Sequence, residues 1–266
     1  LGVILLAFSI VQFVIPIGGF GLHQSLIRYG ALLKSEEEKQ QLFAYVLKKG
    51  IIASLIIILL LILVGYFIPF QFDNTYFYFA ILTFTIITTF IFEIVKIQFR
   101  LQHRNKLYAG AEFSYNLILV LAIFGLSYYF KGIGYVFALI VSPLLTSFFF
   151  IKKLNIKLTS KSSLKITTFS FWKYGLFGGL TSMVTQLLIL IDMVIIGYLI
   201  DDSVAVTNYR YISIIPFSLL FLPRVFINTD FVTFTEKIWE KSYINTYIKN
   251  YMMFFSVASI LIFIFC

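Results

Sequence analysis

The sequence predicts an all-α polytopic membrane protein with about eight transmembrane helices. Of its 266 residues, 60% are hydrophobic and 12% are charged, whereas a soluble domain carries about 25% charged residues. Nineteen of the 21 Lys and Arg residues lie in four clusters, Arg28–Lys49, Lys96–Lys106, Lys152–Lys173 and Arg224–Lys249, which long apolar stretches separate. Cytoplasmic connections of membrane proteins carry such an excess of Lys and Arg. If each apolar stretch crosses a bilayer, all four clusters reach the same side.

Eight apolar stretches account for the predicted helices, because a bilayer-spanning helix needs about 20 apolar residues. Helices are favoured over barrel strands, since Ile51–Val64 is continuously apolar and barrel strands alternate in polarity. The chain begins and ends inside apolar runs, so we expect it to be an internal part of a longer protein. In chain order the stretches are 1–28, 49–69, 76–96, 113–130, 133–151, 174–199, 204–227 and 249–266.

The connections between these stretches differ in length and charge. The predicted outer connections are short, and one of them is only the Lys131-Gly132 turn. The predicted inner connections are longer and basic. The largest of them is rich in Ser, Thr and Lys, as solvated linkers are. The chain is therefore expected to divide into an N-terminal helical bundle (1–158), a cytoplasmic linker (159–173) and the first part of a C-terminal bundle (174–266).

Composition and motifs exclude several functions. The net charge of +9 follows the topology and accompanies no recognition motif, so we expect no nucleic-acid partner and instead contact with the anionic cytoplasmic leaflet. The sequence has neither a phosphate-binding loop nor an H-E-x-x-H motif, and we expect no cofactor or metal. Its single cysteine, Cys266, excludes an internal disulfide framework. The run Gly18-Gly19-Phe20-Gly21 is interpreted as a glycine-softened stretch of helix.

A polar stripe is predicted on the stretch 174–199. Thr181, Thr185 and Asp192 fall on one face of an otherwise apolar helix. An ionisable group at mid-depth costs roughly 2.5–3.5 kcal/mol to insert, so it usually faces a cavity or a partner. Asp192 is therefore either a cavity-facing carboxylate that binds a coupling cation or a substrate group, or an acid in an ion pair between helices.

Two arginines are further candidates for the site. Arg210 breaks the positive-inside pattern, and its guanidinium suits bidentate binding of a phosphate or carboxylate. A structural alternative is an ion pair with Asp192 or with an acid of the nearby outer connection. Arg28 shares a helix face with Gln24 at the predicted cytoplasmic end, where it either marks the inner mouth of a cavity or begins the basic connection.

Other polar and small residues are predicted to be structural. Glu93 and Lys96 are three residues apart and are expected to pair on a helix. Glu112 lies beside a basic connection and is expected to cap a helix or to pair. Gly175 and Gly179 form a G-x-x-x-G motif, which predicts close packing of two helices.

Several short segments resemble polysaccharide-repeat flippases of the Wzx type, within the multidrug/oligosaccharidyl-lipid/polysaccharide exporter superfamily. Phe20–Tyr29 is similar to the end of that family's second helix. Trp172–Leu176 and Leu190–Gly197 are similar to the entry and the end of its seventh helix, and Val206–Tyr209 to the start of its eighth. Phe231–Phe234 departs from the family, which usually has a Phe-Pro-containing stretch there. The order and spacing of the segments, over nearly the whole chain, carry the resemblance.

This resemblance implies two helical bundles that face each other across a central cavity and work by alternating access in a bacterial cell membrane. The implied cargo is a polyprenyl-diphosphate-linked oligosaccharide, turned from the cytoplasmic to the outer leaflet, with H⁺ or Na⁺ as the coupling ion. Such a headgroup cannot cross about 30 Å of hydrocarbon unaided. Arg28, Arg210, Asp192, Gln24 and Thr185 are then the expected substrate or cavity contacts.

Two other functions compete with this one. A cation-coupled multidrug antiporter of the same superfamily would need acids in the first bundle, where the sequence offers Glu93 and Glu112 near predicted connections. A membrane-embedded glycosyltransferase or polymerase would need large outer loops with catalytic side chains. The predicted outer connections hold only about three to six residues, so no enzyme activity is expected.

Overall fold

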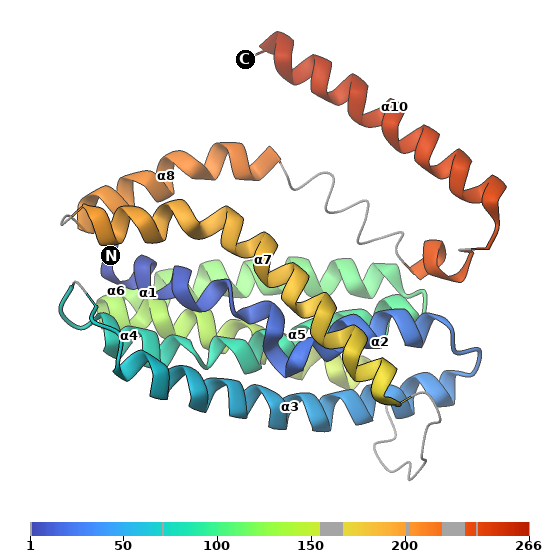
Figure 1. Ribbon diagram of the computed structural model, residues 1–266, viewed down its shortest axis with the longest axis horizontal. Coiled ribbons are helices and arrows are strands. Elements are labelled where there is room, and N and C mark those ends of the chain that lie inside the picture. Colours follow the sequence, from blue (N-terminus) through green and yellow to red (C-terminus); the bar gives the residue numbers. More distant parts are fainter. Residues whose placement is uncertain are drawn as a thin grey trace. The chain divides into compact units, whose positions relative to one another are not determined.

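A computed structural model describes residues 2–70, 72–154, 167–200, 203–219, 232–237 and 239–265. These residues form helices and contain no strand (Figure 1). The elements are α1 (Gly2–Gln12), η1 (Ile15–Gly21), α2 (Leu22–Ala31), α3 (Glu36–Tyr66), α4 (Thr75–Leu82), α5 (Thr85–Leu101), α6 (Asn105–Ile151), η2 (Lys152–Leu154), α7 (Phe169–Leu199), α8 (Ser203–Leu219) and α10 (Lys241–Phe265).

The chain forms two compact units, Leu1–Ile214 and Ile215–Cys266. The first unit holds α1 to α7 and most of α8, and the second holds α10. Within the first unit, α7 packs along α1, η1 and α2 (Figure 1). Most of the predicted linker, 159–173, lies outside the described residues, so the predicted division into 1–158 and 174–266 stays a prediction.

The first predicted span is broken rather than softened at its glycines. Between α1 and α2 the backbone leaves helical geometry, and Gly19, Phe20 and Gly21 are all left-handed, with φ values of 62°, 53° and 68°. The Gly19 N–H donates a hydrogen bond to Ser54 Oγ of α3 at 2.8 Å, which replaces a helical partner. Interpreting this run as a continuous helix was wrong, because three consecutive left-handed residues cannot belong to a right-handed helix.

After α2 the chain crosses the unit twice in opposite directions, first in α3 and then in α4 with α5 (Figure 1). Ser35 precedes α3, its hydroxyl accepts the Glu37 N–H, and the 31 residues of α3 extend about 46 Å at 1.5 Å per residue. This length exceeds the hydrocarbon core of about 30 Å, so the charged first turns extend beyond the apolar part. α4 and α5 then run nearly end to end and together form one apolar stretch, Thr75–Leu101.

The long helix α6 is a hairpin of two helices. Lys131 has φ 52° and ψ −129°, so the helical backbone ends there and begins again. A Cβ on Gly134 would lie 2.0 Å from the Leu126 carbonyl oxygen, which shows that the two arms pack backbone to backbone. The predicted turn at Lys131-Gly132 is therefore confirmed, and it needs almost no connecting loop, while its location on the outer side stays a prediction.

The core of the first unit gathers apolar residues from α1 and from α3 to α6, among them Val11, Ile58, Phe79 and Ile86. Outside this core, large apolar side chains remain exposed in rows along the helices. In a water-soluble protein a continuous apolar surface of this extent is rare, and hydrocarbon is the solvent that suits it. On α3 the row comprises Ile52, Leu55, Ile56, Leu59, Leu60, Leu63 and Val64.

Three basic clusters meet at one end of the first unit. Lys39 Nζ donates to the Leu101 carbonyl oxygen at 2.9 Å, and Arg104 donates to the Lys153 carbonyl oxygen at 2.9 Å. These bonds tie together the connections that follow α2, α5 and α6. We call this the basic end. Its existence agrees with the prediction that the clusters share one side of a membrane.

The opposite end contains the predicted outer turns. A Cβ on Gly132, in the turn of α6, would lie 2.8 Å from the Ile4 side chain and 3.6 Å from the Tyr78 hydroxyl. The starts of α1 and α4 therefore lie beside this turn. Tyr66 packs on Tyr76 nearby, with ring centroids 6.1 Å apart, and tyrosines are enriched at membrane–water interfaces.

The described residues contain five helical segments that are long and apolar enough to cross a membrane: Gly2–Ala31, Glu36–Tyr66, Thr75–Leu101, Asn105–Leu154 and Phe169–Leu199. Because Asn105–Leu154 reverses at Lys131, it accounts for two of the predicted spans. The prediction of an all-α chain with membrane-spanning helices is confirmed. The count of eight and the central cavity stay predictions, since 204–227 and 249–266 include residues that are not described.

Candidate functional site

A lysine held between two glutamates lies inside the first unit. Lys96 Nζ of α5 is 2.8 Å from Glu93 Oε1 on the same helix, and it also forms an ion pair with Glu112 of α6. The lysine side chain is 7% exposed, whereas the Glu93 and Glu112 side chains are 39% and 36% exposed. We call these three residues the charged trio. The ammonium is enclosed and the two carboxylates are partly accessible.

The helix boundaries place the trio within the apolar segments. α5 continues to Leu101 and α6 begins at Asn105, so Lys96 lies more than a turn before the end of α5 and Glu112 two turns into α6. Glu93 and Lys96 are one turn apart on α5, as their spacing predicts, and that predicted pair is confirmed. The expectation that Glu112 caps a helix or pairs is also confirmed, and its partner is Lys96.

Aromatic rings complete the surroundings of the ammonium. Lys96 Nζ lies 4.7 Å from the ring centre of Phe92 and 5.9 Å from that of Tyr108. The Tyr115 ring packs on Phe92, with centroids 4.9 Å apart. Ring faces attract cations, so the ammonium has two carboxylates and two rings as partners. A lysine buried between helices needs such partners, because an unpaired buried charge is strongly destabilising.

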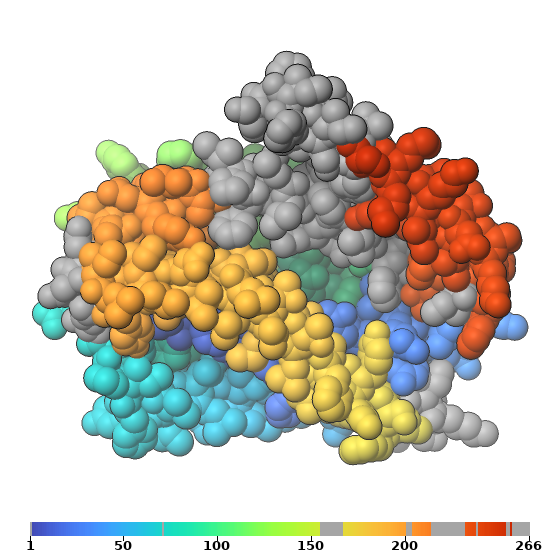
Figure 2. Space-filling view, turned by 45° about the horizontal axis from the view of Figure 1, so that its top comes forward, coloured from blue at the N-terminus to red at the C-terminus, as the bar shows by residue number. Residues whose placement is uncertain are grey.

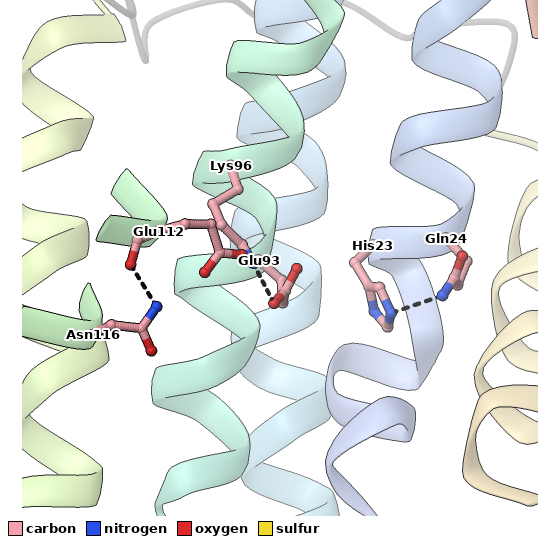
Figure 3. Close-up of polar contacts among 6 residues, drawn as sticks. All are labelled: His23, Gln24, Glu93, Lys96, Glu112 and Asn116. Atoms are coloured by element: carbon pink, nitrogen blue, oxygen red, sulfur yellow. Dashed lines mark hydrogen bonds and ion pairs between the residues drawn. The ribbon is translucent and has the colours of Figure 1, made fainter. Parts of the chain in front are cut away.

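Polar side chains of α2 continue the site toward α7 (Figure 3). Figure 3 shows the Glu93 carboxylate on the side of Lys96 that faces His23, and the two groups interact electrostatically. His23 Nε2 is 3.2 Å from Gln24 Nε2, which in turn lies 3.5 Å from Ser182 Oγ of α7. Polar groups therefore extend from α6 and α5 across α2 to α7. We call His23, Gln24 and Ser182 the polar row.

The predicted site residues Gln24 and Arg28 lie where α2 meets α7. The Arg28 side chain is exposed, and its guanidinium stacks on the Tyr174 ring with the carbon 4.6 Å from the ring centre. Gln24 packs against Gly178, where an added Cβ would come within 3.1 Å of it. Gln24 therefore joins the polar row described above, while Arg28 lies at the basic end, one turn farther along α2.

Close packing of α7 on the broken helix makes this contact possible. An added Cβ on Gly179 would lie 3.0 Å from the Pro16 carbonyl oxygen, and one on Gly175 would lie 2.8 Å from Ser25 Oγ. Ser25 Oγ donates to the Phe171 carbonyl oxygen at 2.5 Å. The predicted G-x-x-x-G packing site is confirmed, and its partner is the left-handed turn before α2.

The predicted stripe lies on α7, part of whose surface is seen in yellow and orange in Figure 2. Thr181, Thr185 and Asp192 are all exposed. The Thr185 hydroxyl donates to the Thr181 carbonyl oxygen at 3.0 Å, within its own helix. Asp192 Oδ2 accepts the Tyr209 hydroxyl of α8 at 2.8 Å. The aspartate thus has a neutral partner on the next helix, and its predicted role in a cavity stays a prediction.

Arg210 lies in the other half of the first unit from Arg28. It is half-buried on α8 and lies in the neighbourhood of Tyr135, four residues after the turn in α6. Within the described part of the chain it forms no ion pair with Asp192, and the acids 201 and 202 are not described. The structure therefore brings Gln24 into the polar row but does not bring Arg28 and Arg210 together.

A separate pocket of about 380 Å³ lies at the start of α7. Its lining is apolar apart from one lysine, and none of the predicted site residues contributes to it. The lining residues are Phe20, Phe169, Trp172, Lys173, Leu176 and Phe177. Across the described residues no group of three His, Cys, Asp or Glu side chains could hold a metal ion.

The charged trio is the feature that the predicted site omits. In the sequence its members lie at or beside the ends of the predicted spans 76–96 and 113–130, where charged residues usually mark the end of an apolar stretch. One sequence signal points to the trio. Tyr108 and Glu112 are four residues apart, so they lie on the same face of a helix, and both contact Lys96. No protein-family model, curated protein or solved structure matches this chain.

Proposed function

We propose that this chain is part of a multi-pass membrane transporter that moves a charged cargo by alternating access. The observation that supports this most directly is the charged trio, which lies between apolar helices of membrane-spanning length. Ionisable groups in such helices are costly and mark ion or substrate pathways. The polar row through His23 and Gln24 extends the same pathway toward α7.

The proposed cargo is a polyprenyl-diphosphate-linked oligosaccharide, flipped from the cytoplasmic to the outer leaflet of a bacterial cell membrane. The sequence segments that resemble Wzx-type flippases support this cargo. In this proposal eight spans form parts of two bundles around a central cavity, with the basic end cytoplasmic. Arg28 and Arg210 are proposed to contact the diphosphate in different stages of transport, because they lie in different halves of the first unit.

The charged trio favours a coupling role over binding of the diphosphate. One ammonium against two carboxylates leaves a formal charge of −1 on the trio when all three are ionised. The nearby guanidinium of Arg100, over the Tyr108 ring, balances this charge, so the trio offers an anionic headgroup no net attraction. We therefore assign H⁺ or Na⁺ coupling to the first unit, together with the carboxylate of Asp192. The same observation supports a second candidate function, a cation-coupled drug antiporter, because the acids it requires lie inside the first bundle.

One pair of assays distinguishes these functions. Glu112→Gln in the full-length protein is expected to lower transport about tenfold or more, because a charge-assisted hydrogen bond contributes about 1.5–3 kcal/mol. Glu37→Gln, on the exposed first turn of α3, is the matched control and should leave transport unchanged. Surface polysaccharide and cytoplasmic-leaflet glycolipid report the flippase, and efflux of an organic cation from cells without glycolipid reports the antiporter.

Each outcome decides between the proposals. Loss of surface polysaccharide together with accumulated glycolipid supports the flippase. Loss of cation efflux with normal polysaccharide supports the antiporter. If both transport activities persist at normal protein levels in Glu112→Gln, the charged trio has no part in transport. Arg28→Ala and Arg210→Ala test the diphosphate contacts, which are excluded if polysaccharide export is unchanged.

A further inference from the structure

The charged trio resembles a cation-binding site that already holds a cation. Its two carboxylates come from different helices, and the Lys96 ammonium lies between them. The ring faces of Phe92 and Tyr108 approach the same nitrogen atom. Carboxylate oxygens and ring faces are the groups that bind an alkylammonium ion.

Burial distinguishes this lysine from an ordinary surface ion pair. The Lys96 side chain is 7% exposed and the carboxylates are more than a third exposed. Access to the site from outside the protein therefore reaches the acids, whereas the ammonium is supplied from within α5. The polar row at His23 and Gln24 lies on the Glu93 side of the lysine (Figure 3).

We propose that Lys96 is a built-in cation, which fills a site that would otherwise bind a monovalent metal ion such as Na⁺. The inference deepens the proposed transport function and rests on it for its biological meaning. In this view α5 and α6 are joined through Glu93 and Glu112 at any sodium concentration. The first unit then does not depend on Na⁺ at this site, and removing the ammonium creates such a dependence.

The physical reason lies in the repulsion between the glutamates. Without Lys96, the carboxylates of Glu93 and Glu112 would face each other and repel. Arg100, whose guanidinium carbon lies 5.6 Å from the centre of the Tyr108 ring, acts on Glu93 more weakly than the ammonium and would offset only part of this repulsion. A small cation that binds both oxygens relieves this repulsion and stabilises the folded protein by mass action. A proton relieves it as well, so the competition with sodium is measured at one fixed alkaline pH.

The test compares thermal unfolding of the purified full-length protein in sodium chloride and in N-methyl-D-glucamine chloride, whose bulky cation exceeds the space that a lysine ammonium leaves. Lys96→Met is expected to gain a sodium-specific rise in melting temperature of about 2–4 °C at a concentration several times the dissociation constant. The unmodified protein should show no such difference. Lys39→Met is the matched control, because Lys39 is also buried but has one carboxylate partner, Glu36.

Two further variants make the result decisive. Adding Glu93→Gln to Lys96→Met removes one of the two carboxylates and is expected to abolish the sodium response. Lys96→Gln replaces Lys96→Met if the methionine variant does not fold, since its amide still donates hydrogen bonds to both acids. The same shift in the unmodified protein, or its absence in folded variants lacking Lys96, overturns the proposal. Because the assay measures binding alone, its failure is distinguishable from failure of the proposed transport function.

Discussion

Replacing Gly21, the residue before α2, with alanine is expected to destabilise the first unit strongly. Gly21 has a φ of 68°, and it lies against α7 at the G-x-x-x-G site. An added Cβ would be 2.0 Å from the Gly175 carbonyl oxygen and 3.1 Å from the Gly179 Cα. Both neighbours are backbone atoms, so neither can rotate away. The two helices would have to separate.

Three contributions set the magnitude of this effect. The left-handed conformation costs an L-residue about 1–2 kcal/mol. Forcing an extra methyl group into a packed contact costs about 1–3 kcal/mol. Alanine also restricts the unfolded chain, which returns about 0.4–1 kcal/mol. The net loss in the free energy of unfolding is about 2–4 kcal/mol, or a fall in melting temperature of about 4–16 °C for a chain of this size.

Thermal unfolding of the purified protein in one detergent measures this loss. Gly125→Ala is the control, because Gly125 lies in the helical part of α6 with nothing within 4 Å of an added Cβ. Alanine there should leave the melting temperature unchanged or raise it slightly, since alanine favours helix. Equal melting temperatures for the two variants would refute the close approach of α7 to the turn before α2.

Two more predictions address the break in the first helix and the topology. Ser54→Ala leaves the buried Gly19 N–H without its partner and should lower the free energy of unfolding by about 1–3 kcal/mol; a loss below about 0.5 kcal/mol in a denaturation series would contradict this. The topology is tested with Glu37→Cys and Asp73→Cys, each in a protein that also carries Cys266→Ser. An impermeant thiol reagent should label these two cysteines from opposite faces of the membrane. Labelling of both from the same face of intact cells would contradict the orientation of α3.

Helical content and packing motifs were predictable because they depend on local sequence. Lys131 is the only charge between Glu112 and Lys152, and a glycine follows it, so the turn of α6 was expected and is confirmed. Gly175 and Gly179 were expected to permit close packing for the same kind of reason. Their partner was not predictable, because it is the left-handed turn at Gly21. Neither periodicity nor composition specifies a backbone conformation of that type.

The charged trio does not follow from the sequence, because charge alone places the helix ends incorrectly. The predicted span ends at Lys96, whereas α5 continues to Leu101. Its packing explains the extension, since Phe99 and Leu101 are fully buried and the Lys39 ammonium caps the Leu101 carbonyl. Tertiary contacts of this kind are formed by residues far apart in sequence. A single sequence therefore predicts the Glu93–Lys96 pair but not the approach of Glu112.

The one-residue reversal at Lys131 has a consequence for how the protein enters its membrane. Because the two arms of α6 are in backbone contact at Gly134, we expect them to leave the insertion machinery together, as a pair. The lysine ammonium would then cross the bilayer in the same event. A spacer of several residues placed at this turn would uncouple the two insertions, which stalled nascent chains of increasing length can resolve.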